Sequence, residues 1–326
     1  AWDMEGLEKH LPGQVKAFIA DHNIKFYTID GIKIGKEIGL GGRINTVLQS
    51  AFFKLASIIP EEEAIDLMKK AAKATYGRKG DKIVQMNYDA IDAGAKQVVE
   101  IEVPESWKSC EDEGLFTPEV KGGKDDVVAF VKNIQSKVNA QEGNTLPVST
   151  FTDYADGSTP SGSAAYEKRG IAVNVPVWTP ENCIQCNRCA YVCPHAAIRP
   201  VAMTEAEAAE APVALDMTGM KEYKFAIAVS ALDCTGCGSC ANVCPGKKGA
   251  KALAMENMEA NVESQKFFDY AVTLPEKEDV IAKFKENTVK GSQFKQPLLE
   301  FSGACAGCGE TPYAKLITQL FGDRMY

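Results

Sequence analysis

Two matching runs of sequence decide the fold: Cys183-Ile-Gln-Cys186-Asn-Arg-Cys189-Ala-Tyr-Val-Cys193-Pro194 and Cys234-Thr-Gly-Cys237-Gly-Ser-Cys240-Ala-Asn-Val-Cys244-Pro245. Together they hold eight of the eleven cysteines of this 326-residue chain. Each run reads C-x2-C-x2-C-x3-C-P. Two-residue gaps let a tightly curled loop point three sulfurs to one side, and the proline disfavours a helical conformation at the fourth cysteine. The repeat therefore predicts two copies of one ligand-binding loop.

The spacing is that of bacterial two-cluster ferredoxins, in which three thiolates of a run hold one 4Fe-4S cube and the fourth crosses to the other cube. Soft thiolates are the ligands that such clusters select, and small residues such as Gly236 and Gly238 let backbone N–H groups approach the sulfurs. The crossing predicts one cluster on Cys183, Cys186, Cys189 and Cys244, and a second on Cys234, Cys237, Cys240 and Cys193.

Zinc and disulfide bonds are the alternatives. A structural zinc site closes with four ligands, typically as two C-x2-C pairs, and does not use a third and fourth cysteine in one run. Disulfides need an oxidising, secreted setting that nothing in the sequence supports. His195 follows Pro194 and is expected to pack beside the clusters rather than to be a ligand.

Length and charge bound the class of protein. A chain of this length predicts two or three domains. With 36 basic and 44 acidic side chains, its net charge of -8 argues against a nucleic-acid or anionic-membrane partner. No apolar run approaches the ~18 residues of a membrane span, and the first residues do not read as a signal peptide. We expect a reducing, cytoplasmic setting and, since the first residue is not Met, a piece of a longer protein.

The first hundred residues read as α/β. Their patterns predict helices at residues 15–21, 44–59 (buried), 61–76 and 83–96, and strands at 24–30 and 98–103. The glycines of residues 39–43 precede a helix, where they could cradle a phosphate or simply form a tight turn.

The following residues change in character. We expect an amphipathic helix at 126–138, a linker at 156–163, strands at 171–177 and 225–229, and an exposed helical insert at 204–211. Cys110 belongs to no pattern and is expected to be buried and inert. Cys305 and Cys308 form a further C-x2-C, but two thiolates cannot complete a four-cysteine cluster. Their partners are expected beyond Tyr326; a thioredoxin-like redox pair is the alternative.

With these motifs assembled, the chain resembles the pyruvate:ferredoxin (flavodoxin) oxidoreductases, the single-polypeptide type of 2-oxoacid oxidoreductase. The matching stretches are residues 41–45 (GGRIN), 51–55 (AFFKL), 166–170 (YEKRG), both cysteine runs and residues 303–313 (GACAGCGETPY). The resemblance implies an enzyme of anaerobic metabolism that splits pyruvate with magnesium and thiamine diphosphate and forms acetyl-coenzyme A. Its electrons pass one at a time through three 4Fe-4S clusters to ferredoxin or flavodoxin, and the full enzyme is expected to be a homodimer.

By resemblance, Asn45 and Asn87 correspond to contacts with coenzyme A, Glu310 to a contact with thiamine diphosphate, and Cys305 and Cys308 to half of the proximal cluster's ligands. The implied fold class is α/β and α+β multidomain. The implied domains are 1–120, the end of the CoA-binding domain; 121–159, a small linking domain; 160–278, a two-cluster ferredoxin domain; and 279–326, the start of the thiamine-diphosphate domain.

Two hypotheses follow. In the first, the chain is an internal piece of the oxidoreductase, carries electrons, and contains no complete catalytic site. In the second, it is a stand-alone iron-sulfur subunit that docks to separate catalytic chains. A start codon before Ala1 and a stop codon after Tyr326 would exclude the first.

Overall fold

The computed structural model describes residues 3–111 and 123–325. It divides into two units, Ala1–Phe116 and Thr117–Tyr326, each described by itself below. The expected fold class is confirmed, because helices combine with several small sheets in the described residues. The domain boundary predicted at residues 120 and 121 lies outside the described residues. No helix of the described chain is long and apolar enough to cross a membrane.

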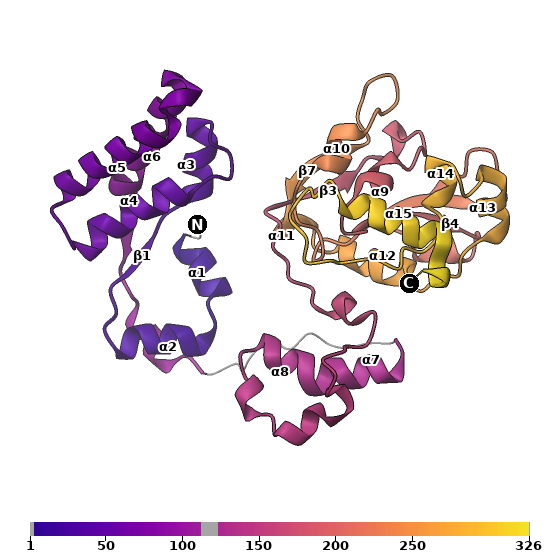
Figure 1. Ribbon diagram of the computed structural model, residues 1–326, viewed down its shortest axis with the longest axis horizontal. Helices are drawn as coiled ribbons and strands as arrows, with labels where there is room; N and C mark the ends of the chain where they lie inside the picture. The colour runs from indigo at the N-terminus through magenta and orange to yellow at the C-terminus, as the bar shows by residue number, and fades with distance from the viewer. Residues whose placement is uncertain (1–2, 112–122, 326) are drawn as a thin grey trace. The chain divides into compact units, whose positions relative to one another are not determined.

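The first unit consists of helices joined by one short antiparallel ribbon (Figure 1). Its elements are α1 (Met4–His10), α2 (Gly13–Asp21), β1 (Phe26–Thr28), α3 (Gly31–Ile38), α4 (Asn45–Ala56), α5 (Glu61–Tyr76), α6 (Asp81–Lys96) and β2 (Val99–Ile101). Strand β1 pairs with β2 so that Tyr27 lies opposite Glu100. The helices predicted at 15–21, 61–76 and 83–96 are confirmed, and the two predicted strands are present but shorter.

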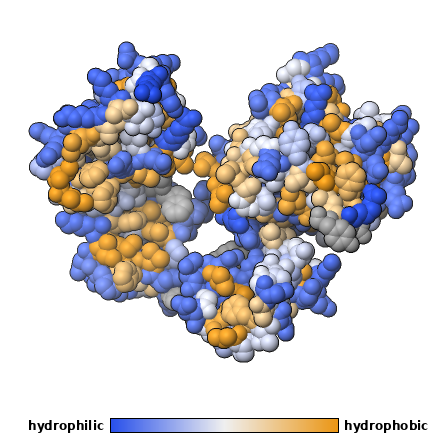
Figure 2. Space-filling view, viewed as in Figure 1, coloured by the Kyte–Doolittle hydropathy of each residue, from blue (hydrophilic) through white to orange (hydrophobic). Residues whose placement is uncertain are grey.

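Helix α4 was expected to be buried, and that expectation is wrong for one of its faces. Its buried residues Val47, Ser50 and Ala51 pack against α6, where the Ser50 hydroxyl donates to the carbonyl oxygen of Ile91 at 2.6 Å. The opposite face has no partner among the described residues of this unit, so apolar side chains such as Phe52 are exposed. Figure 2 shows apolar surface over the helices of this unit.

The second unit has more and shorter elements. They are α7 (Asp125–Phe130), α8 (Ser136–Asn139), β3 (Asn174–Trp178), α9 (Arg188–Val192), β4 (Ile198–Met203), β5 (Leu215–Asp216), β6 (Lys224–Val229), α10 (Ser239–Val243), β7 (Leu253–Asn257), α11 (Met258–Asn261), α12 (Ser264–Ala271), α13 (Glu278–Phe284), α14 (Val289–Ser292) and α15 (Thr311–Phe321). A π-helical turn, Val131–Gln135, joins α7 to α8, so the helix predicted at 126–138 is present with one widened turn. That turn shifts the apolar face, and Val138 is exposed.

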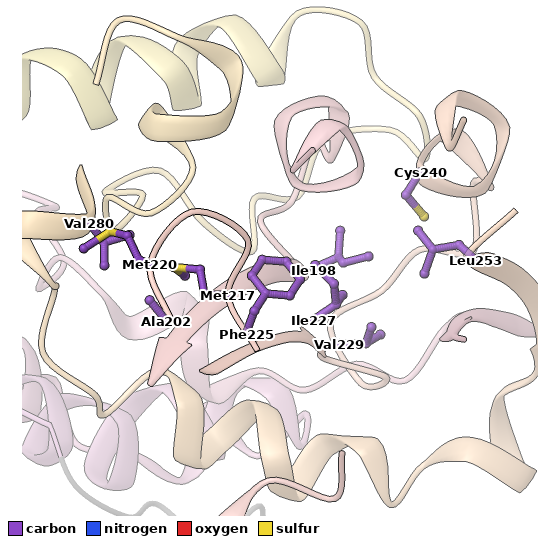
Figure 3. Packing of buried hydrophobic residues seen from close by; sticks show 10 residues of the cluster. All are labelled: Ile198, Ala202, Met217, Met220, Phe225, Ile227, Val229, Cys240, Leu253 and Val280. Carbon is purple, nitrogen blue, oxygen red and sulfur yellow. The ribbon is translucent and has the colours of Figure 1, made fainter. Parts of the chain in front are cut away.

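Two antiparallel sheets carry the cysteine runs. Strand β3 pairs with β7, and β4 and β5 flank β6. The strand predicted at 225–229 is confirmed, whereas that predicted at 171–177 begins three residues later, at Asn174. Figure 3 shows the core on which these sheets pack, with Phe225 at its centre and the sulfur of Cys240 directed from α10 toward Leu253.

The acidic segment 204–211 was expected to be an exposed helical insert; most of its residues are exposed, but it does not form an α-helix. It contains a single 3-10 turn, Glu207–Glu210. Thr204 and Glu207 cap each other, since the backbone N–H of Thr204 donates to the Glu207 carboxylate and the N–H of Glu207 donates to Thr204 Oγ1. Glu207 also forms an ion pair with Lys277 at 2.7 Å, while Ala208 and Ala211 pack on the core. These tertiary contacts hold the segment against the sheet and override its helical composition.

Candidate metal centre

The two cysteine runs fold into loops of the same shape. The second run lies 51 residues after the first (234 − 183 = 51), and each loop repeats the same features at that offset. The N–H of Gln185 donates to Cys183 Sγ at 3.4 Å, and the N–H of Gly236 donates to Cys234 Sγ at 3.3 Å. Gln185 and Gly236 both have positive φ, of 55° and 68°. The backbone therefore turns the same way around both first cysteines.

A short helix follows each loop. Asn187 and Gly238 occupy the N-caps of α9 and α10 with left-handed backbones, φ 59° and 76°. The third cysteine of each run, Cys189 or Cys240, is the second residue of its helix. The fourth comes directly after the helix and before a proline, in an extended conformation. Helices α9 and α10 are in contact, so each fourth cysteine reaches toward the loop of the other run.

Two cavities result, and four cysteines line each of them. The first site is the cavity lined by Cys183, Cys186, Cys189 and Cys244, with apolar walls that include Trp178 and Phe225. The second site is the cavity lined by Cys193, Cys234, Cys237 and Cys240, with walls that include His195 and Ile198. These are the two sets of four that the crossed assignment predicts. That they bind clusters stays a prediction.

The two sites are neighbours. Cys189 of the first site lies close enough to Cys240 of the second for their charges to interact. Cys240 is part of the central core, and Cys183, Cys189, Cys193 and Cys244 pack against the same core. An electron placed in one cavity is therefore separated from the other by only a few packed side chains.

Burial governs the thiols of both sites. It raises the pKa of Cys183 and of Cys189 in the first site. In the second site it raises the pKa of Cys234 to about 11 and that of Cys240 to about 12. Burial thus favours the protonated thiols, whereas iron would displace the protons, since thiolate is the form that binds metal.

The residues present fit an iron-sulfur cluster. Each cavity offers four soft sulfurs, apolar walls and N–H donors; in the first site the N–H of Ala252 donates to Cys244 Sγ at 3.3 Å. No group of three or more His, Cys, Asp or Glu side chains in the described chain is placed to hold a single metal ion. A cube holds its four thiolates farther apart than one ion does, so cluster binding does not require such a group.

The third C-x2-C lies against the second site. The α-carbon of Gly307, between Cys305 and Cys308, is so close to Cys237 that a Cβ added there would be 3.4 Å from the Cys237 Cβ. Cys305 is exposed and Cys308 partly so. The pKa of Cys308 is lowered by a hydrogen bond from the Thr311 hydroxyl and by backbone N–H groups at the start of α15. Cys110 lies in the other unit and is partly exposed, so the expectation that it is buried is wrong; it follows a surface 3-10 turn.

His195 packs beside the second site, as expected. Its side chain is 2% exposed, and Nδ1 lies 3.1 Å from the carbonyl oxygen of Ser302. Burial lowers the pKa of His195. Its own carbonyl oxygen accepts from the N–H of Phe301 at 3.0 Å. His195 thereby joins the end of the first cysteine run to the segment that leads into Cys305.

The three residues matched to organic cofactors belong to different units, Asn45 and Asn87 to the first and Glu310 to the second. Asn45 is the exposed first residue of α4, and Asn87 is buried in α6 with its amide donating to the Ile83 carbonyl oxygen at 2.8 Å. Helix α6 comes close to the start of α4 where Gly94 approaches Val47. Asn87 is seven residues from Gly94, which is roughly 10 Å along α6. Glu310 is the exposed N-cap residue of α15. Their cofactor roles remain predictions.

Sequence reasoning missed four residues that support the sites. The side chains of Gln185 and Asn187 anchor the first loop: Gln185 bonds to the backbone at Asp216 and Thr218, and Asn187 to the carbonyl oxygen of Lys290. Trp178 directs its indole toward the first site, and Lys315 reaches the turn between the sites. For Gln185 and Asn187 the sequence offered one signal, their position between closely spaced cysteines. For Trp178 and Lys315 it offered none.

Three protein families match consecutive parts of the chain. "Pyruvate ferredoxin/flavodoxin oxidoreductase" matches residues 3–97, the EKR "domain of unknown function" matches 118–172, and the "4Fe-4S dicluster domain" matches 182–248. The last match spans both cysteine runs, which supports iron-sulfur clusters as the cofactor class.

Curated relatives match along nearly the whole chain. The pyruvate-flavodoxin oxidoreductase of Enterobacter agglomerans is 50% identical over 328 residues, covering 100% of this chain and 27% of the relative. The pyruvate:ferredoxin oxidoreductase of Moorella thermoacetica is 51% identical over 330 residues, covering 99% and 27%. Pyruvate dehydrogenase (NADP(+)) of Cryptosporidium parvum is 44% identical over 349 residues, covering 99% and 18%.

The chain thus spans about a quarter of the length of the first two relatives. It carries in order the oxidoreductase, EKR and dicluster segments. Since the match covers nearly the whole chain and about half of the aligned residues are identical, the resemblance inferred from the motifs is confirmed: the chain corresponds to a part of the pyruvate:ferredoxin and pyruvate-flavodoxin oxidoreductases.

Proposed function

We propose that this chain is the electron-transfer portion of a pyruvate:ferredoxin or pyruvate-flavodoxin oxidoreductase. The observation that carries the proposal is the gathering of eight cysteines into two adjacent, crossed sets of four. Bound clusters would accept and release one electron at a time at low potential. The polypeptide supplies the thiolates, the N–H donors and the apolar walls that tune such potentials.

The position of the third cysteine pair supports a direction for the transfer. Gly307 lies against Cys237 and Ser239, so the Cys305–Cys308 loop adjoins the second site. We propose that electrons enter through a proximal cluster held in part by Cys305 and Cys308. They then reach the second site, and they leave through the first site toward ferredoxin or flavodoxin.

The remaining expectations belong to the complete enzyme. We propose that pyruvate, coenzyme A, magnesium and thiamine diphosphate bind largely outside this chain, with Asn45, Asn87 and Glu310 as contacts. The four domain limits, the homodimer and the cytoplasmic setting are proposed with them. The continuous match to single relatives favours an internal piece over a stand-alone subunit.

Anaerobic reconstitution of the chain tests the proposal. Iron and sulfide analysis should give about eight of each per chain, as two cubes require. Low-temperature EPR of the reduced protein should show two magnetically coupled clusters, because the sites are adjacent. About four irons, or iron without sulfide, would contradict the paired assignment.

A further inference from the structure

Helix α15 packs with its polar side inward. Thr311, Lys315 and Gln319 recur every four residues, and all three are buried. Tyr313, Ile317 and Phe321 are offset from them by two residues and are exposed, Tyr313 at 68%. This reverses the usual arrangement, in which apolar residues face the core. The buried polar residues therefore need specific partners in the second unit.

Lys315 finds its partners at the end of α9. Its side chain is 1% exposed, and Nζ donates to the carbonyl oxygens of Ala190, Tyr191 (3.4 Å) and Cys193 (3.0 Å). These carbonyls lie at the C-terminal end of a helix, where they carry partial negative charge, and that of Ala190 also accepts from the N–H of Cys193 at 3.2 Å. Figure 1 shows α15 beside α9, and the two helices are in contact.

The charge of Lys315 lacks a carboxylate partner, because no described Asp or Glu forms an ion pair with it. The charged or ionisable side chains that interact with it are the thiols of Cys193 and Cys189 and the guanidinium of Arg199. An uncompensated buried ammonium is destabilising, and three carbonyls offset only part of that cost. The neighbours able to supply full negative charge are cysteines, one from each site.

We propose that Lys315 is a positioning residue for electron transfer: its buried ammonium fixes the turn between the two cysteine sites and stabilises the reduced state of the cluster in each. The inference rests on the proposed function, since it requires two clusters. Adding an electron makes a cluster more negative, and a nearby fixed cation in a medium of low dielectric favours that state. One lysine beside Cys189 and Cys193 therefore raises both reduction potentials together.

The same residue couples the sites to the third cysteine pair. Lys315 lies on the helix that begins just after Cys308, and Gly307 contacts Cys237. The segment from Cys305 to Lys315 thus contacts both short helices or their adjoining loops. A helix cap alone would explain the three hydrogen bonds, but it would not require a charge.

The experiment compares Lys315→Met with the unaltered protein in the complete oxidoreductase, using EPR-monitored redox titration without oxygen. Methionine keeps the length and removes the charge. We expect the iron content to be unchanged. The equilibrium ratio of oxidised to reduced cluster should rise about tenfold in both sites, which corresponds to a reduction potential about 59 mV lower for a one-electron couple. Lys315→Arg keeps the charge, so its two reduction potentials should lie close to those of the unaltered protein.

Further variants separate the outcomes. Lys277→Met is the matched control, because it removes a largely buried lysine of the same unit whose charge is already balanced by Glu207; its potentials should not change. Full iron content with unchanged potentials in Lys315→Met would overturn the inference. If that variant loses its clusters, Lys315→Gln, which keeps a donor without charge, is titrated instead with the same two criteria. Absence of clusters from the unaltered protein would refute the proposed function itself.

Discussion

The two cysteine sites share one backbone and differ in what holds it. In the first site the two left-handed positions are Gln185 and Asn187, whose side chains bond to the backbone of distant segments at Asp216, Thr218 and Lys290. In the second site the same positions are Gly236 and Gly238, which have no side chains to anchor. A left-handed backbone costs roughly 1–2 kcal/mol in most residues and little in glycine.

This difference matches what lies next to each site. The walls of the first site include the buried aromatic side chains of Trp178 and Phe225. The second site has an exposed cysteine, Cys237, and the Cys305–Cys308 loop packs against it. The same loop can thus have anchoring side chains at its left-handed positions, as in the first site, or glycines that let another segment approach, as in the second.

Replacing a single cysteine ligand should have the largest effect, because it should remove the cluster of one site and leave the other. Cys189→Ser and Cys240→Ser are equivalent changes, and each should lower the iron content from about eight to about four by removing the cube of its own site. The crossing makes a sharper claim: Cys244→Ser should resemble Cys189→Ser in its remaining EPR signal, and Cys193→Ser should resemble Cys240→Ser.

Cys110→Ser is the control, and it should keep all the iron, because Cys110 lies in the other unit. The opposite pairing of signals would mean that each run keeps its own fourth cysteine.

Replacing Asn187 in the first site should lower the free energy of unfolding more than replacing Gly238, which occupies the same position in the second site. Asn187→Ala loses the 2.9 Å bond to Lys290 and forces alanine into a left-handed backbone, for a loss of about 2–3 kcal/mol. Gly238→Ala has free space around the added methyl group, so only backbone strain remains, about 1 kcal/mol. Anaerobic unfolding followed by loss of cluster absorbance measures both.

Asn187→Gly separates the two contributions, since it removes the bond without strain. Equal stability of Asn187→Ala and Gly238→Ala would show that the side-chain anchor contributes nothing.

Thiol reactivity in cluster-free protein should also distinguish the sites. Cys237 is exposed, whereas burial raises the pKa of Cys189, so at pH 8 the thiolate form of Cys189 is depleted. Alkylation at Cys237 should be at least about tenfold faster, as mass spectrometry of timed samples would show. Raising the pH should narrow the gap, because a thiol with a raised pKa gains thiolate as pH rises toward that value. Equal rates at pH 8 would show that the first site opens when iron is removed.

The smallest expected effect concerns Trp178. Its buried indole N–H has no hydrogen-bond partner among the described side chains and backbone groups. Burial raises the pKa of Cys183, while the backbone N–H of Gln185 and the indole of Trp178 lower it. Trp178→Phe keeps an aromatic ring but loses this donor, which should lower the potential of the first cluster alone by about 40 mV, the equivalent of ~1 kcal/mol.

Trp107→Phe is the control in the other unit, where the indole donates to Glu8. A shift of both clusters in Trp178→Phe, or of neither, would contradict a local effect of the indole on the first site.

Local patterns predicted much of the fold and mispredicted segments whose outcome depended on distant contacts. The helices at 61–76 and 83–96 carry strong periodicity and are present as expected. The acidic segment 204–211 has helical composition, but Lys277, 70 residues after Glu207, holds it as a single turn. Burial of α4 was overestimated because an apolar run does not reveal which of its faces lacks a neighbour.

The sequence by itself determined the ligand chemistry, because the number, type and spacing of the cysteines specify a repeated loop that only an iron-sulfur cluster uses fully. It also determined the family resemblance. The spacing also predicted which four cysteines share a cavity. Tertiary structure decided which site adjoins Cys305 and Cys308, and why Lys315 is buried. Spacing records contacts within a loop, whereas the electrostatic surroundings of a site come from segments more than a hundred residues apart, such as α9 and α15.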